Sequence, residues 1–158
     1  MTMKYSNILV PYDKSDSAKR ALETALDFAA LNEEARVTLF FAAPVPEFAT
    51  GEFMAASRMS GSIRLTPEDI DRMQQDYLDF ERATLDEDIQ AVIAEQGEKL
   101  KVVVGQGKPS KAILDFAAED KSDLIVMGCR GLNAVAGMLG SVSYAVLRNA
   151  NSPVLVEK

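Results

Sequence analysis

A doubly wound α/β fold with a parallel sheet is predicted by three features of the sequence. Apolar strand patterns alternate with helical patterns along the chain, which is typical of parallel sheets with helices on both faces. A glycine-rich loop, with Gly128 and Gly131, follows one buried strand. The 158 residues, 47% of them hydrophobic, suit one core without a linker or repeat. We therefore expect a single domain over residues 1–158.

The first part of the chain predicts two strands, a helix and a long loop. Asn7 to Tyr12 is an apolar strand pattern, and Val37 to Ala43 is a second one, rich in aromatic and branched residues. From Ser15 onward, alanine and leucine recur at helical spacing between these strands. Pro44 to Thr66 follows neither period and contains Pro, Gly and Ser, so we interpret it as a long loop.

The rest of the chain predicts one long helix and then five shorter elements. Thr66 is expected to cap the long helix, with Pro67 at its first position and Gly97 at its end. The following elements are a strand at Lys101 to Val104, a helix at Pro109 to Glu119, a strand at Asp123 to Met127, a helix at Ser141 to Arg148 and a strand at Pro153 to Glu157.

The composition excludes several classes of function. A net charge of −7 argues against a nucleic-acid or acidic-membrane surface. No apolar run is long enough to span a bilayer and no signal peptide is recognisable, so we expect a cytoplasmic protein. One cysteine and no histidine exclude a disulfide framework and Ser–His or Cys–His catalysis. We expect no catalytic residues, no metal ligands and no enzyme.

The loop after the strand at Asp123 to Met127 has the features of a phosphate site. Gly128 and Gly131 let the backbone approach a ligand closely. Gly140 and Ser141 place free amides and a hydroxyl at a helix N-terminus, where the helix dipole favours an anion.

These motifs resemble the universal stress protein family. Gly128 to Gly131, a spacer and Gly140-Ser141 resemble its nucleotide loop, and Ile8 to Ser15 resembles its opening strand and turn. The resemblance continues through Val104 to Pro109 and Asn151 to Val156. It implies strand order 3-2-1-4-5, with a ligand at the carboxyl ends of strands 1 and 4, where the order reverses. It also implies a stress-response role and a bound adenine nucleotide, ATP with Mg²⁺ or Mn²⁺, and slow ATP hydrolysis stays open.

The resemblance assigns roles at this site, and each has a structural alternative. Asp13 would contact the nucleoside or shape the turn, and the Ala42 backbone would contact adenine. Arg130 and the serine hydroxyls would contact phosphate, although Ser141 could also cap the last helix. The glycines could instead serve close packing. The predicted nucleotide-binding set is Pro11, Tyr12, Asp13, Ala42, Met127, Gly128, Arg130, Gly131, Gly140, Ser141, Val142 and Ser143.

Two departures from the family pattern keep an alternative open. The spacer Leu132 to Leu139 has eight residues where nine are usual, and Lys14 stands where many members have glycine. A shifted loop could misplace the phosphate amides. The alternative function is therefore a dimeric interaction protein that acts without a nucleotide.

The last strand predicts a homodimer. Val154, Leu155 and Val156 would lie at a sheet edge with unpaired backbone groups. The resemblance implies that this strand pairs with its two-fold mate, so these residues form the predicted dimer interface.

Overall fold

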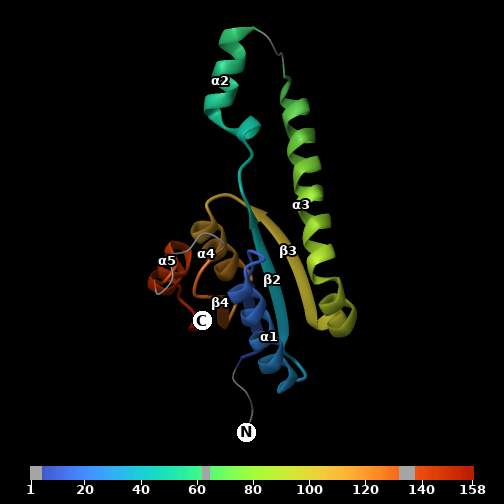
Figure 1. Cartoon of the computed structure of the whole chain (residues 1–158), viewed down its shortest axis with the longest axis vertical. Coiled ribbons are helices and arrows are strands. Elements are labelled where there is room, and N and C mark those ends of the chain that lie inside the picture. The colour runs from blue at the N-terminus through green and yellow to red at the C-terminus, as the bar shows by residue number, and fades with distance from the viewer. Residues whose placement is uncertain (1–4, 62–64, 132–137) are drawn as a thin grey trace.

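A five-stranded parallel sheet forms the centre of the computed structural model (Figure 1). The structure describes residues 5–61, 65–131 and 138–158. The strands are β1 (Asn7–Pro11), β2 (Arg36–Ala43), β3 (Leu100–Gln106), β4 (Leu124–Gly128) and β5 (Val154–Glu157), in the order β3-β2-β1-β4-β5. The order confirms the predicted fold class, and strand ends differ from the predictions by only one or two residues.

Helices cover both faces of the sheet. They are α1 (Asp16–Ala30) and α3 (Pro67–Gln96) on one face, and α4 (Pro109–Glu119) and α5 (Ser141–Asn149) on the other. Ile8 and Val10 of β1 pack in the layer of α1 and α3, whereas Leu9 packs in the layer of α4 and α5. Because β1 is buried on both faces from Ile8 to Pro11, its sequence is apolar throughout this range.

Local sequence signals set the helix boundaries that were predicted. The Ser15 side chain caps α1. Thr66 caps α3 in a capping box with Asp69, and Gly97 ends this helix with a φ of 55°. A short 3-10 turn, η2 (Gly97–Lys99), then leads into β3. Among the described helices, none combines the length and apolar character needed to cross a membrane.

The two ends of the sheet are closed differently. At the amino ends, the Asp123 carboxylate accepts hydrogen bonds from the backbone N–H groups of Ser6 and Asn7 at 2.8 and 3.0 Å. This contact ties the start of β1 to the start of β4. At the carboxyl ends, the same two strands lead into the loops that contain Asp13 and Gly131, and a pocket lies between these loops.

The long loop predicted from Pro44 to Thr66 is wrong in part, because most of it is helical. It contains a 3-10 turn, η1 (Glu47–Ala49), and a helix, α2 (Gly51–Ser60), which Thr50 caps. None of the residues in α2 is buried, so its sequence lacks the apolar periodicity of a packed helix. Residues 62–64 lie outside the described part. We call residues 44–61 and 67–84, most of which extend beyond the sheet in Figure 1, the arm. At its base, Arg82 donates a hydrogen bond to the Val102 carbonyl oxygen of β3.

Candidate functional site at the carboxyl ends of β1 and β4

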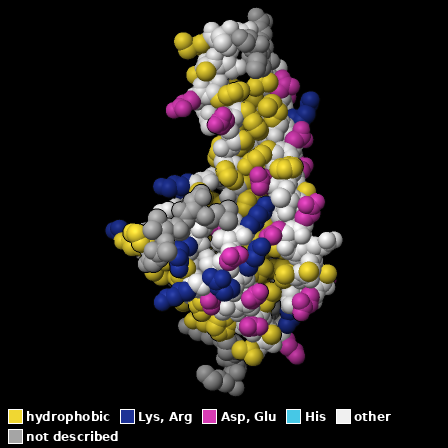
Figure 2. Space-filling model, viewed as in Figure 1, with side chains coloured by type: hydrophobic (Ala, Val, Ile, Leu, Met, Phe, Trp, Pro, Cys, Tyr) yellow, Lys and Arg dark blue, Asp and Glu magenta, His cyan; other side chains and the backbone are white. Residues whose placement is uncertain are grey.

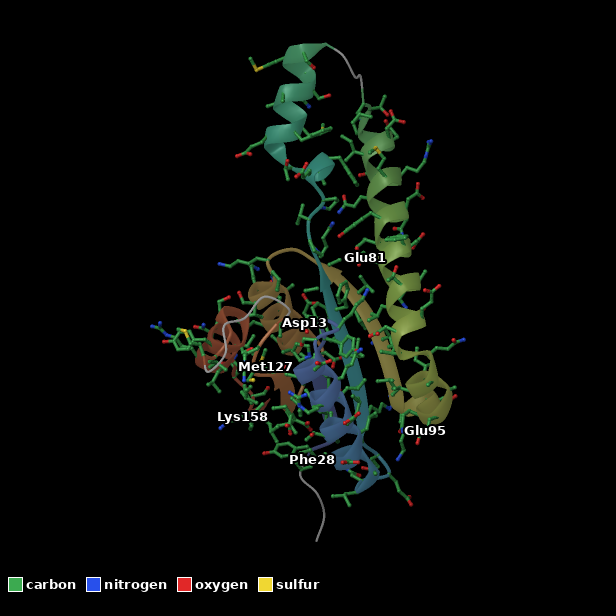
Figure 3. The ribbon with its side chains drawn as sticks, in the orientation of Figure 1. Asp13, Phe28, Glu81, Glu95, Met127 and Lys158 are labelled. Atoms are coloured by element: carbon green, nitrogen blue, oxygen red, sulfur yellow. The ribbon has the colours of Figure 1, made fainter. Side chains whose placement is uncertain are left out.

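A pocket of about 520 Å³ lies where the winding of the sheet reverses. All twelve residues predicted for the nucleotide site line it. Figure 3 labels two of these residues, Asp13 after β1 and Met127 in β4. The pocket also contains residues that the sequence analysis missed, namely Ala18, Phe40, Phe41, Pro109, Ile113, Met138 and Leu139. The volume is in the range of small-molecule sites.

The missed residues include an apolar wall built by β2 and α4. The Phe40 ring stacks on Phe116, with centroids 4.7 Å apart, and Ile113 lies in the same apolar cluster. Gly105 leaves room for this ring, since a Cβ there would lie 2.5 Å from Phe40. Strand alternation is the signal that could have found Phe40, because it shares a face of β2 with Ala42.

Asp13 has one oxygen in a turn and one beside the glycine loop. Its Oδ1 accepts a hydrogen bond from the Ser15 backbone N–H at 3.0 Å, so the carboxylate does shape the turn before α1. Its Oδ2 lies beside Gly131, where a Cβ would be 2.7 Å away. Gly131 therefore makes room for the Asp13 carboxylate, and the two positions are not independent.

Close packing explains why residue 128 is glycine. A Cβ on Gly128 would lie 2.8 Å from the Ser17 carbonyl carbon and 2.9 Å from the Ala18 nitrogen, in the first turn of α1. The Ser17 hydroxyl also donates a hydrogen bond to the Arg130 carbonyl oxygen at 2.6 Å. The loop after β4 is thus fixed directly against α1, and Gly128 serves close packing there.

The N-cap of α5 is Gly140 rather than Ser141, which corrects the capping alternative. The Gly140 N–H donates to the Cys129 carbonyl oxygen at 2.8 Å. A Cβ on Gly140 would lie 3.3 Å from that same oxygen. The contact between Gly140 and Cys129 therefore places the N-cap at Gly140. Ser141 is the first helical residue, whereas it would precede the helix if it were the cap.

The first amides of α5 are available to a ligand. Within the described part of the chain, the backbone N–H groups of Ser141, Val142 and Ser143 have no hydrogen-bond acceptor. These residues line the pocket, so the N-terminus of this nine-residue helix points its positive dipole end at the cavity.

The Ser143 hydroxyl has a different role from the one predicted. It is buried and donates a hydrogen bond to the Gly128 carbonyl oxygen at 2.8 Å. Its proton is therefore already used, and the donor that Ser143 presents to the pocket is its backbone N–H. The side chain instead ties the end of β4 to α5.

Tyr12 connects the pocket to α3. Its hydroxyl donates to Asp88 Oδ2 at 2.7 Å, and Asp88 also forms an ion pair with Lys19 at 3.4 Å. Burial, followed by the hydrogen bond to Asp88 and the charge of that carboxylate, raises the pKa of the Tyr12 phenol. The phenol therefore stays neutral, with its proton directed to α3.

Two basic side chains lie beside the pocket without a carboxylate partner among the described residues, Arg130 and Lys14. Lys14 has a φ of 67°, which explains why glycine would suit this position. Its Nζ lies 5.5 Å from the centroid of the Phe41 ring. Arg130 and Lys14 carry the same sign of charge as the N-terminal end of α5, so these groups would attract an anion together.

The effect of the eight-residue spacer, Leu132 to Leu139, on the phosphate amides stays a prediction, because residues 132–137 lie outside the described residues. Over the ranges that the structure does describe, no group of three or more His, Cys, Asp or Glu side chains is arranged to hold a metal ion.

Comparison with known sequences identifies the family. Residues 4–158 match the model of the universal stress protein family. Universal stress protein MJ0577 of Methanocaldococcus jannaschii is 28% identical over 159 residues, covering 100% of this chain and 98% of the relative. The universal stress protein in QAH/OAS sulfhydrylase 3'region of Thermus aquaticus is 31% identical over 153 residues, covering 96% of this chain and 98% of the relative.

Solved structures agree with this assignment. Universal stress protein UspA from Lactobacillus plantarum has a TM-score of 0.71 and 28% identity, covering 98% of both chains. A universal stress protein in complex with cAMP has a TM-score of 0.63 and 26% identity, covering 98% of this chain and 97% of its own. The Archaeoglobus fulgidus protein in complex with dAMP has a TM-score of 0.57 and 27% identity, covering 99% of this chain and 100% of its own. The chain belongs to the universal stress protein family.

Proposed function

We propose that the pocket binds an adenine nucleotide, ATP together with Mg²⁺ or Mn²⁺, and that the bound nucleotide alters the conformation or partner contacts of a stress-response protein. The observation that carries the proposal is the pairing of an apolar wall with free helix amides in one pocket. Phe40 and Ile113 offer apolar surface to a base, whereas the amides of Ser141, Val142 and Ser143 suit phosphate. The related proteins solved with cAMP and dAMP support the same ligand class.

Each part of the nucleotide has a partner in this proposal. The Ala42 backbone contacts adenine, the Asp13 carboxylate contacts the nucleoside, and Arg130 lies with the α5 amides at the phosphates. No chemical step is assigned to these residues. The nucleotide acts as a ligand whose binding free energy shifts an equilibrium between conformations.

Calorimetry with ATP and Mg²⁺ on ligand-free protein tests the proposal. We expect saturable binding at submillimolar ATP, and weaker binding of adenosine because it lacks the groups that the α5 amides and Arg130 would bind. Native mass spectrometry of protein purified without added nucleotide should show which adenine nucleotide co-purifies. Absence of binding at millimolar ATP would favour the alternative, an interaction protein that needs no nucleotide.

A double-mutant cycle separates the two roles of Gly131. In Gly131→Ala, the new Cβ would meet Asp13 Oδ2, so a loss of affinity could come from the carboxylate alone. We therefore compare this change in the native chain and in Asp13→Ala, where the carboxylate is gone. If Gly131 is needed because the ligand approaches its backbone closely, Gly131→Ala should lower ATP affinity by about tenfold, or 1.4 kcal/mol, both in the native chain and in Asp13→Ala. Loss only when Asp13 is present would assign the glycine to carboxylate positioning.

We also propose a homodimer through the outer edge of β5. The carbonyls of Pro153 and Glu157 accept hydrogen bonds from the backbone N–H groups of Ile125 in β4 and of Cys129, which follows β4. Backbone groups alternate along a strand, so Val154 and Val156 turn theirs to the outer edge, with the Leu155 groups toward β4. Val156→Pro removes an outward N–H without removing a β4 contact. Light scattering should show a dimer for the native chain and a monomer for this variant, and a monomeric native chain would refute the dimer.

A further inference from the structure

We propose that the arm is a docking surface for a positively charged amphipathic helix of a partner protein. The proposal concerns residues outside the pocket and does not depend on nucleotide binding. It stands on an uncovered apolar surface and on the charge that surrounds that surface.

The arm has apolar side chains but no core. None of the residues in η1 and α2 is buried, and the buried residues of α3 are Leu85 and Ile89, which lie beyond the arm. Val45 and Phe80 are 47% and 66% exposed. Figure 2 shows hydrophobic side chains gathered on the arm between α2 and α3. Apolar side chains gathered in this way on the outside of a protein mark an interaction site.

The spacing of this surface suits a helix. Ile70, Met73, Tyr77 and Phe80 recur at intervals of three and four residues, so they form one stripe along α3, in which Phe80 is exposed and the other three are half-buried. Phe53 and Met54 are half-buried on α2. Two helices cannot enclose a core, whereas a third helix laid along both would bury the stripe from the open side.

The charge of the arm selects the kind of helix. The arm has eight acidic side chains and three arginines, a net charge of −5, whereas the whole chain has a net charge of −7. The remaining residues therefore sum to −2. Glu47, Glu52 and Asp76, from η1, α2 and α3, are exposed on the arm. A second copy of the chain would bring like charges together, whereas lysine and arginine on a partner would be attracted.

The test uses a designed peptide of about 18 residues, with leucine on one helical face and lysine elsewhere, labelled for fluorescence anisotropy. The control peptide has glutamate in place of lysine. The arm variant combines Glu47→Gln, Glu52→Gln and Asp76→Asn. The matched control removes the same charge from α1 and its following turn through Glu23→Gln, Asp27→Asn and Glu33→Gln, which are also exposed.

We expect the lysine peptide to bind the native chain and the glutamate peptide not to bind. The arm variant should bind the lysine peptide at least about fivefold more weakly, and the α1 variant should change affinity less than about twofold. Phe80→Ser should weaken binding even at high salt, because its contribution is apolar. Equal losses in the arm and α1 variants would show general attraction to an acidic protein and overturn the proposal. A change of dimerisation in Phe80→Ser, with unchanged peptide affinity, would assign the arm to a second copy and also overturn it.

Discussion

The two ends of α3 form one continuous helix in two different environments. Leu85 and Ile89 are 0% and 1% exposed and pack against the sheet, whereas Phe80, little more than one turn before Leu85, is 66% exposed. Glu81, labelled in Figure 3, is in the turn between them. Capping and propensity form the helix at both ends, but only the sheet offers a surface on which to bury side chains. Stability in this protein is therefore expected to come from the α/β body, while the arm adds little.

The largest expected effect separates the two ends of α3 directly. Leu85→Ala removes a fully buried side chain and should lower the free energy of unfolding by about 2–5 kcal/mol. Phe80→Ala should change it by less than about 0.5 kcal/mol. Urea denaturation of both variants measures the difference. Similar losses for both would mean that the arm is part of the cooperative core.

A pair of glycines gives the next contrast. Gly128→Ala would place a Cβ within 3 Å of the α1 backbone and should destabilise the protein by about 1–3 kcal/mol. Gly51→Ala, at the start of α2, has no neighbouring atom within 4 Å of the new Cβ and should leave the unfolding midpoint unchanged. Thermal unfolding of both variants tests this. A large loss for Gly51→Ala would show that the arm is packed more tightly than the structure indicates.

Alkaline pH should affect the body through Tyr12. Because folding raises the pKa of this phenol, its contribution to stability is complete below the ordinary tyrosine pKa of about 10 and is lost as the pH rises above it. Tyr12→Phe should therefore flatten the fall in urea midpoint between about pH 9 and 11. Tyr77 on the arm also has a raised pKa, from burial and then Glu81, and Tyr77→Phe is the control. An equal effect of the two changes would contradict the separation of body and arm.

The smallest expected effect on global stability is the loss of the α3 cap. Thr66→Ala removes the capping box with Asp69 and should weaken the first turns of the helix by about 1 kcal/mol. Because these turns open locally, hydrogen exchange there should accelerate while the global unfolding energy stays constant. Ser15→Ala removes the cap of α1 in the body and should lower the global value instead. Unchanged exchange in Thr66→Ala would show that something other than the cap holds the arm helix.

Local signals in the sequence were sufficient for the elements whose ends or faces are chemically marked. The apolar run of β1 and the Thr66-Pro67 start of α3 predicted those elements correctly. The same signals failed for α2, because a helix without a fully buried residue needs no apolar period. Strand order came from the family resemblance, since alternation of strands and helices does not distinguish between doubly wound orders.

The sequence by itself determined where the pocket lies, because glycines, a turn aspartate and a helix start mark the ends of β1 and β4. Only the tertiary structure decided what each residue does there. It placed the Gly128 backbone against α1 and Gly131 beside the Asp13 carboxylate. It also directed the Ser143 hydroxyl to the Gly128 carbonyl oxygen, to which it donates a hydrogen bond. It also brought Phe40 into the site. These outcomes depend on distances between elements that are far apart in the chain, and residue type and local spacing do not encode such distances.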